Sequence, residues 1–268
     1  MLRVSTTTSL YATGLLDMLS DKFSEKYPNI RVEFIAVGSG AALRLAEKGD
    51  VDMILVHAPN LEVEYIDKGV IVDGKIFAYN TFVIVGPSDD PAGISGKDPI
   101  IAMTCIYDAC ERGEAVFVSR GDESGTHQRE LLLWSLAGLD PQDKEWYVET
   151  GTGMSETLLY ANERNAYTLS DIGTYLKLKS EGRLAYLTCL VDQGRELMNI
   201  YSVYIVNYKK YTGVRKDIAE KFMEFLLSDE GQELIGNYGK EEYGQPLFYP
   251  AKGEEDELRE CWEWFAEA

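Results

Sequence analysis

The chain has 268 residues, which is enough for two modest domains or one large one. Hydrophobic residues make up 45% and charged residues 26%, a composition that excludes a disordered chain, a collagen and a disulfide miniprotein. The formal net charge of −19 repels nucleic acid and anionic lipid surfaces at long range, and taken alone it favours a neutral or cationic ligand.

The first third of the chain alternates patterns typical of strands and helices. Apolar runs at 2–5, 30–37 and 53–56 predict strands, and the spacing of apolar residues at 15–23 and 41–48 predicts the helices between them. The run at 53–56 is apolar throughout, as in a strand buried on both faces of a parallel sheet. This βαβαβ order predicts an α/β fold with right-handed crossovers.

A second alternating series follows a strand-like run at 82–85 and a loop rich in Gly, Pro, Ser and Asp at 87–98. The segment after an apolar stretch at 199–206 is predicted to be mainly helical. The predicted elements of the second series are a helix at 100–111, a strand at 115–119, a helix at 128–137, a strand at 146–149, a helix at 155–161, a strand at 166–169 and a helix at 172–178.

Two long strand-like stretches, near 79–86 and 198–207, stand where these sections change over. This arrangement predicts two α/β lobes joined by two crossing hinge strands. One predicted lobe comprises residues 1–82 plus 205–268, and the other comprises residues 83–204.

Membrane spans and metal sites find little support in the sequence. No uncharged run reaches the ~20 residues of a spanning helix. No signal peptide is visible, so the chain is either cytosolic or has lost a leader. Cys105 and Cys110 have a spacing that suits one helix better than a disulfide or a redox pair. With His57 and His127 as the only histidines, we expect no Cys/His zinc site.

Two loops of small hydroxyl and glycine residues follow the first two predicted strands. Residues 5–9 (Ser-Thr-Thr-Thr-Ser) lead into a helix, with Ser9 as a plausible N-cap, and residues 37–42 (Val-Gly-Ser-Gly-Ala-Ala) also precede a helix. A solvated cap explains each loop in isolation. Helix N-termini also suit anion capture, because they offer free N–H groups and a positive dipole end. The recurrence at neighbouring strand ends favours a ligand site there.

The segment 119–127 (Ser-Arg-Gly-Asp-Glu-Ser-Gly-Thr-His) carries the sharpest signal, since it leaves a predicted strand and enters a predicted helix. Arg120 offers a planar donor fork for an oxyanion, and Asp122 is placed to orient that guanidinium. The hydroxyl and N–H groups at 124–126 begin the helix. A surface salt bridge with a helix cap is the alternative, but the coincidence of these features favours an oxyanion site.

A fourth loop, residues 150–155 (Thr-Gly-Thr-Gly-Met-Ser), also precedes a predicted helix and offers further N–H donors. A capping box from Thr152 or Ser155 explains this loop at least equally well. None of the loops matches the Walker A or GxGxxG nucleotide-binding patterns.

Together these motifs resemble those of the class II solute-binding proteins of ABC transporters, and most closely those of the tungstate-binding members. The resemblance covers nearly the whole chain. The motifs at residues 5–9 and 119–127 are fairly specific in combination. It is carried by residues 5–9 with Gly14-Leu15-Leu16, by Gly49-Asp50-Val51-Asp52 with Leu55-Val56-His57-Ala58-Pro59, by residues 79–87, by residues 119–127 and by residues 244–250 (Gly-Gln-Pro-Leu-Phe-Tyr-Pro).

The resemblance implies a two-lobed periplasmic-binding-protein type II fold and a high-affinity receptor, not an enzyme, that delivers tungstate to an ABC transporter permease. It implies an extracytoplasmic monomer whose leader has been removed, with no cofactor, no metal beyond the bound oxometalate and no nucleic-acid partner. The ligand contacts that it implies by position are Thr8, Ser9, Ser39, Arg120, Ser124 and Thr126. Further candidates are Thr7, Gly40, Gly125, Thr152 and Gly153, with Asp122 orienting Arg120.

The chemistry of the loops bears on the choice of anion. Phosphate carries a proton at neutral pH, so a selective site benefits from a buried acceptor, whereas tungstate, molybdate and sulfate are fully deprotonated. Loops 5–9 and 38–42 hold no carboxylate, and Asp122 is expected to be occupied with Arg120. Donor-only chemistry favours tungstate, molybdate or sulfate, and the preference for tungstate comes from the resemblance. A molybdate, sulfate or phosphate receptor of the same fold is the alternative.

Two other functions are rivals. Ser124 and His127 are three residues apart, as in a nucleophile–base pair of a hydrolase, but no Gly-x-Ser-x-Gly elbow is present and this helical spacing rarely aims an imidazole at a serine oxygen. An intracellular anion-sensing module of the same fold usually follows a DNA-binding helix-turn-helix, and no basic N-terminal helix is found here.

Overall fold

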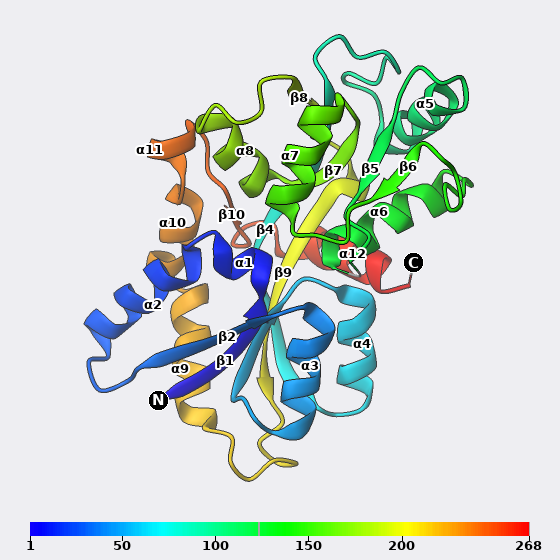
Figure 1. Ribbon diagram of the computed structural model, residues 1–268. Helices are drawn as coiled ribbons and strands as arrows, with labels where there is room; N and C mark the ends of the chain where they lie inside the picture. Colours follow the sequence, from blue (N-terminus) through cyan, green and yellow to red (C-terminus); the bar gives the residue numbers. More distant parts are fainter. Residues whose placement is uncertain (123, 268) are drawn as a thin grey trace. The chain divides into compact units, whose positions relative to one another are not determined.

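The computed structural model describes residues 1–122 and 124–267, and the chain packs as two compact units (Figure 1). The chain passes from one unit to the other within strand β4 and again near the start of strand β9. The boundaries expected from the sequence, after residues 82 and 204, fall in these same two strands. Unit 1 comprises Met1–Asn80 and Ile200–Ala268, and unit 2 comprises Thr81–Asn199.

Unit 1 alternates strands and helices up to β4 and is mainly helical after β9. Its elements are β1 (Leu2–Thr7), α1 (Thr8–Ala12), α2 (Leu15–Lys26), β2 (Val32–Val37), α3 (Ser39–Lys48), β3 (Met53–Val56), α4 (Pro59–Asp67), most of β4 (Ile71–Pro87), most of β9 (Met198–Val206), α9 (Lys216–Leu227), α10 (Asp229–Asn237), α11 (Lys240–Tyr243), β10 (Tyr249–Pro250) and α12 (Glu255–Glu267).

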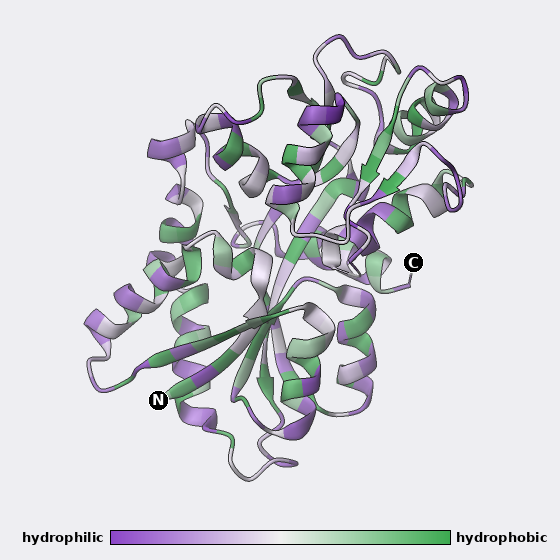
Figure 2. Ribbon diagram, in the orientation of Figure 1, coloured by the Kyte–Doolittle hydropathy of each residue, from purple (hydrophilic) through white to green (hydrophobic). Residues whose placement is uncertain are grey.

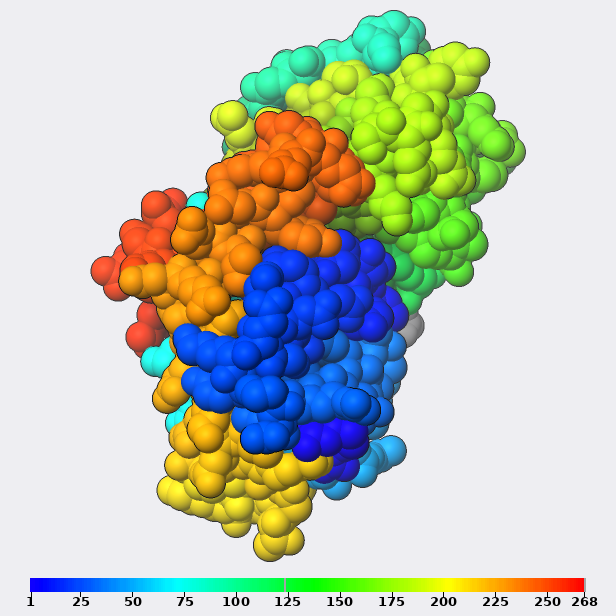
Figure 3. Space-filling view, turned by 90° about the vertical axis from the view of Figure 1, so that its left-hand side faces the viewer, coloured from blue at the N-terminus to red at the C-terminus, as the bar shows by residue number. Residues whose placement is uncertain are grey.

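The strands of unit 1 form a sheet in the order β10-β4-β9-β3-β1-β2. Strands β1, β2 and β3 run parallel, and β9 pairs antiparallel with β3. Helices α3, α4 and α12 pack together, and α2, α9 and α10 form a second group. Figure 3 shows this second group, with the N-terminal helices in blue against α9 and α10 in orange. Within it the rings of Phe23 and Phe222 meet edge to face, 5.0 Å apart.

Hydropathy explains how these helices lie on the sheet. All four residues of β3 are buried, as predicted for its uninterrupted apolar run. Helices α3, α4 and α9 each carry apolar and hydrophilic residues on different sides (Figure 2). Burying the apolar side is the main gain for such helices, because each CH₂ removed from water contributes about 0.8 kcal/mol.

Asp52 joins three segments of unit 1. Its fully buried carboxylate accepts the backbone N–H groups of Arg3, at 2.8 Å, and of Arg215, at 3.0 Å. The Arg215 guanidinium lies 3.2 Å from the same carboxylate. Because Arg3 lies in β1 and Arg215 precedes α9, one acidic side chain fixes β1 and α9 against the turn that begins β3.

Glu62 is a second buried carboxylate of unit 1. It accepts the backbone N–H of Ala58 at 2.7 Å and the side chains of Tyr204 and Trp262, each at 2.8 Å. Burial raises the pKa of Glu62, although these hydrogen bonds oppose the shift. Ala58 is the N-cap of α4, Tyr204 lies in β9 and Trp262 lies in α12. This carboxyl group therefore holds the C-terminal helix in place.

Unit 2 is a smaller α/β assembly. Strands β7 and β8 pair antiparallel with the second half of β4, and β5 pairs parallel with β6. Phe117, Trp134 and Tyr167 are among the largest side chains of one core cluster. The elements are α5 (Pro99–Glu111), β5 (Phe117–Ser119), α6 (Gly125–Leu136), β6 (Tyr147–Glu149), α7 (Met154–Arg164), β7 (Thr168–Asp171), α8 (Ile172–Ser180), β8 (Leu187–Val191) and a 3₁₀ turn, η1 (Arg195–Leu197).

The α/β class predicted from the alternation of patterns is confirmed. The expected sharing of one helix by Cys105 and Cys110 is confirmed in α5, and both are free thiols. Helix α4 and strand β8 were not predicted. The apolar residues of α4 alternate at Leu61, Val63 and Tyr65 as in a strand, and its helical form depends on packing against α12. Among residues 1–122 and 124–267, no helix has the length and apolar character to cross a bilayer.

Candidate functional site

The hydroxyl-rich loops of unit 1 lie at one edge of its sheet. Thr7 is in register with Val37 on the parallel strand β2, and Thr6 is in register with Leu55 on the parallel strand β3. The carboxyl ends of these three strands therefore meet at one edge. The segments that follow them, Thr8–Ser9, Gly38–Gly40 and His57–Ala58, leave the sheet there, as ligand-binding loops do in open α/β folds.

Thr7 is the N-cap of α1. Its Oγ1 accepts the backbone N–H of Leu10 at 3.3 Å, so the expectation that Ser9 caps this helix is wrong. The helix begins at Thr8, directly after the last residue of β1, so Ser9 lies in the first turn of the helix. There the Ser9 hydroxyl lies 3.4 Å from both the Thr7 hydroxyl and Nε2 of His57. Thr8 is exposed.

His57 is not among the predicted ligand contacts, but it lies beside one of them, Ser9. Its ring lies 4.9 Å from that of Tyr201 and is almost fully buried. The signal that identifies it is its position immediately after β3, at the edge where Ser9 leaves β1. An imidazole beside Ser9 holds that hydroxyl group in one direction.

Ser39 is the first residue of α3, and its hydroxyl does not cap the helix. The N-cap is Gly38, which offers no side chain, and Gly40 follows as the second helical residue. The Ser39 Oγ is buried and has no hydrogen-bond partner within residues 1–122 and 124–267. A buried hydroxyl left unpaired costs about 1–3 kcal/mol, so this one is poised to donate to a ligand oxygen.

In unit 2 the loops after β5 and β6 are joined by hydrogen bonds. The two strands are parallel, with Ser119 opposite Glu149. The backbone N–H of Thr150 donates to the Ser119 carbonyl at 3.0 Å, and that of Gly151 donates to the Arg120 carbonyl at 2.8 Å. These two bonds hold Ser119 and Arg120 next to the start of the loop after β6.

Arg120 is held from two sides. Its guanidinium Nη2 pairs with Asp122, whose other carboxylate oxygen accepts the backbone N–H of Ser124 at 3.2 Å. Arg120 is only 9% exposed, and its Nε has no hydrogen-bond partner in the described part of the chain. Both Asp122 oxygens are thus used, while a buried N–H of the arginine is left for an acceptor.

Gly121 allows the turn that follows Arg120. Its φ of +59° lies in the left-handed region, and a Cβ there would come within 2.7 Å of the Glu149 Cβ. A residue other than glycine would be strained at this position and would collide with Glu149.

Ser124 is the N-cap of α6. Its Oγ accepts the backbone N–H of His127 at 3.3 Å, which explains the three-residue spacing of Ser124 and His127 as a helix cap. The helix then begins at Gly125 and Thr126, and its first turn holds no acidic residue. The first N–H groups of a twelve-residue helix and its positive dipole end are available to an anion here.

The hydroxyl groups of the loop after β6 bond mainly to one another. Thr152 donates to Thr150 at 3.1 Å, and the Thr150 and Thr157 hydroxyls are 2.9 Å apart. The expected alternative of a capping box from Thr152 or Ser155 is wrong, because the N-cap of α7 is Gly153, without a side-chain bond. The N–H groups at the exposed start of α7 therefore lack a side-chain acceptor.

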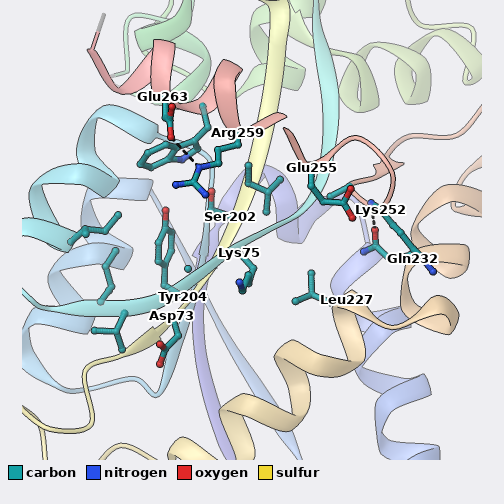
Figure 4. A pocket seen from close by; sticks show the side chains of 17 residues that line it. Asp73, Lys75, Ser202, Tyr204, Leu227, Gln232, Lys252, Glu255, Arg259 and Glu263 are labelled. Carbon is teal, nitrogen blue, oxygen red and sulfur yellow. Dashed lines mark hydrogen bonds and ion pairs between the residues drawn. The ribbon is translucent and has the colours of Figure 1, made fainter. Parts of the chain in front are cut away.

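A cavity of about 720 Å³ lies elsewhere in unit 1, and none of the candidate residues lines it. Figure 4 shows it bordered by Lys75 and Tyr204 on the sheet side and by Arg259 on α12. Among residues 1–122 and 124–267 there is also no group of three or more His, Cys, Asp or Glu side chains that could hold a metal ion. The candidate anion contacts are hydroxyls, N–H groups and one arginine, with Asp122 beside Arg120 and His57 beside Ser9.

Comparison with known proteins identifies the family. The family model described as PBP superfamily domain matches residues 2–230. The tungstate-binding protein TupA of Peptoclostridium acidaminophilum is 39% identical over 92% of this chain and 84% of its own. The solved structure of the tungstate-binding protein TupA from Desulfovibrio alaskensis G20 matches with a TM-score of 0.84 and 41% identity, over 93% of this chain and 98% of that one.

The chain belongs to the PBP superfamily and, within it, to the TupA family. Membership confirms the type II periplasmic binding fold expected from the resemblance. The TupA family consists of solute-binding proteins, not enzymes, which agrees with the use of Ser124 as a helix cap. The solved structure of the tungstate ABC transporter from Geobacter sulfurreducens is also similar, with 45% identity, a TM-score of 0.77 and coverage of 88% of this chain and 98% of that one.

Proposed function

We propose that this protein is a receptor that binds tungstate and delivers it to the permease of an ABC transporter. The observation that carries the proposal is the pair of buried donors, Ser39 Oγ and Arg120 Nε, that lack acceptors in the described part of the chain. Both stand beside helix starts. The names of the TupA relatives support tungstate as the anion that accepts hydrogen bonds from these donors.

We propose that the anion accepts hydrogen bonds from the candidate residues of the loops described above. Thr8, Ser9 and Ser39, with Thr7 and Gly40, are the candidates in unit 1. Arg120, Ser124 and Thr126, with Gly125, Thr152 and Gly153, are the candidates in unit 2, and Asp122 orients Arg120. We also propose that the protein works as a monomer outside the cytoplasm, where such a receptor meets its ligand.

The donor set supports a fully deprotonated anion. Both oxygens of Asp122 already accept hydrogen bonds, from Arg120 and from the Ser124 N–H. Within the described residues, the carboxylate of this loop is thus engaged with groups of its own loop, which disfavours its use for the proton that phosphate carries at neutral pH. Tungstate, molybdate and sulfate need donors alone, which this arrangement supplies.

A thermal-shift panel tests the proposal. The melting temperature is expected to rise by several degrees with micromolar tungstate, because a ligand that binds only the folded state stabilises it by mass action. Molybdate, sulfate and phosphate at the same concentration serve as comparisons. No rise with any of the four anions would contradict the proposal, and a rise with phosphate alone would identify a different receptor.

Replacing Ser39 by alanine is expected to weaken tungstate binding about fivefold, the effect of losing one hydrogen bond of about 1 kcal/mol. The melting temperature without ligand should not fall, because the variant removes a buried hydroxyl that has no protein partner. Calorimetric titration with tungstate and a thermal scan measure both effects.

Ser5→Ala is the matched control for Ser39→Ala. The Ser5 hydroxyl is also buried, but it donates to the Ala42 carbonyl at 3.2 Å. We expect Ser5→Ala to lower the melting temperature and leave tungstate affinity unchanged. The opposite pattern in the two variants would remove Ser39 from the site.

A further inference from the structure

Glu130 is a buried carboxyl group in α6, and the anion contacts proposed above do not include it. It is 2% exposed and lies among the aromatic side chains of the unit 2 core. Its Oε1 accepts the Tyr147 hydroxyl at 2.6 Å and the Trp134 Nε1–H at 3.3 Å. A carboxyl group in such surroundings is costly to ionise, so its presence calls for a role.

Hydrogen bonds link Glu130 to the turn that holds Arg120. Tyr147, which donates to Glu130, stands in β6 opposite Phe117 of β5, and β5 ends at Ser119. The Ser119 Oγ in turn accepts the backbone N–H of Gly121 at 3.2 Å. Arg120 lies between Ser119 and Gly121, so its backbone follows directly from the strand pair that contains the partner of Glu130.

We propose that Glu130 is a positioning residue of the anion site and that it takes up a proton when the anion binds. A dianion beside Arg120 makes a second negative charge in the same buried region more costly, which favours the neutral carboxyl group. By linkage, protonation of Glu130 then strengthens anion binding. This inference rests on the proposed role of Arg120.

The groups facing Glu130 fit this role. Strand β6 contributes Tyr147 and Glu149, and burial together with the Glu149 charge raises the pKa of Glu130 to about 7, although hydrogen bonds oppose the shift. Burial and Glu130 itself raise the pKa of Tyr147 well above neutrality, so Tyr147 remains a donor. On α6, His127 lies one turn earlier, 4.0 Å from Glu149.

Two other charged groups near this part of α6 are already engaged. Arg129 donates to the carbonyls of Glu196 and Met198, at 2.7 and 2.8 Å. Asp122 pairs with Arg120. Glu130 is therefore the buried carboxyl group of this region that is placed to exchange a proton when the anion binds.

Calorimetric titration with tungstate at pH 7, in two buffers of different ionisation enthalpy, measures the protons taken up on binding. We expect the wild type to take up a fraction of a proton and to bind several-fold more tightly at pH 6.5 than at pH 8. Glu130→Gln should bind with no uptake and with an affinity that is flat over this range. Uptake that persists in Glu130→Gln but disappears in His127→Asn would overturn the proposal, as would no uptake in the wild type.

Tyr147→Phe tests the same proposal with the carboxyl group retained. Removing the phenol takes away a hydrogen bond that lowers the pKa of Glu130, so the pH dependence of tungstate affinity should move to higher pH. A purely structural role of Glu130 would leave this profile in place. Failure of the proposed function would appear separately, as the absence of any tungstate binding by the wild type, and failure of the proposed role of Arg120 would appear as unchanged binding in Arg120→Ala.

Discussion

Arg120→Ala is expected to weaken tungstate binding by at least tenfold and up to about a hundredfold in calorimetric titration. Arg120 is the buried cation of the candidate site, and a hydrogen bond to a charged group contributes about 1.5–3 kcal/mol. Its loss leaves the dianion with neutral donors only. It also leaves the Asp122 carboxylate without its guanidinium partner, close to a negative ligand.

Three further variants separate the contributions of the charge of Arg120, its planar shape and its pairing with Asp122. Arg120→Lys keeps the charge without the planar fork and should fall between the wild type and Arg120→Ala. Arg120→Ala combined with Asp122→Asn should recover part of the affinity, because the uncompensated carboxylate is gone. Arg112→Ala makes the same charge change at an exposed pair with Glu114 and should bind normally. Wild-type affinity in a folded Arg120→Ala protein would show that the anion binds elsewhere.

Asp52→Ala is expected to lower the free energy of unfolding of unit 1 by about 3 kcal/mol. The substitution removes two buried hydrogen bonds from backbone N–H groups to a charged acceptor, each worth roughly 1.5 kcal/mol or more. It also removes the ion pairs to Arg3 and Arg215, which add less because both guanidinium groups are partly exposed. A fall of about 6–12 °C in melting temperature corresponds to this loss.

Asp50→Ala is the control for this prediction. Asp50 stands in the same turn, carries the same charge and is exposed, so its removal should leave the melting temperature almost unchanged. Tungstate affinity, measured below the melting transition, should be close to that of the wild type in both variants. A melting temperature of Asp52→Ala equal to that of Asp50→Ala would mean that the buried carboxylate does not hold β1 and α9 together.

Local sequence patterns were sufficient for much of the fold. The apolar run at 53–56, flanked by helical spacing, predicted a buried parallel strand, and β3 is that strand. The Gly-rich and Ser-rich segments could be placed after strands because glycine and small hydroxyl residues favour turns and helix caps. The structure places both segments at the ends of neighbouring parallel strands, but not as loops: residues 5–7 belong to β1, Thr8 and Ser9 begin α1, and α3 begins at Ser39.

The caps were harder to predict, because several hydroxyl residues in a row satisfy the same pattern. Ser9 and Thr7 are equally good N-caps by type, and the end of β1 decides for Thr7. In the same way glycines are the N-caps of two other helices. Gly38, directly before Ser39, is the N-cap of α3, and Gly153, which lies between Thr152 and Ser155, is the N-cap of α7. The residue at which the strand ends decides which hydroxyl caps the helix and which one remains available to a ligand.

The sequence by itself thus determined the α/β class, most of the order of its elements, the segments that carry hydroxyl groups and arginine, and the family resemblance. Only the tertiary structure decided which of these groups are buried and unpaired, as at Ser39 and Arg120. It also revealed the buried carboxylates Glu62, whose partner Trp262 is 200 residues away, and Glu130. The physical reason is that periodicity and turn chemistry act between near neighbours in the chain, whereas burial and hydrogen-bond partners come from segments that meet only in the folded protein.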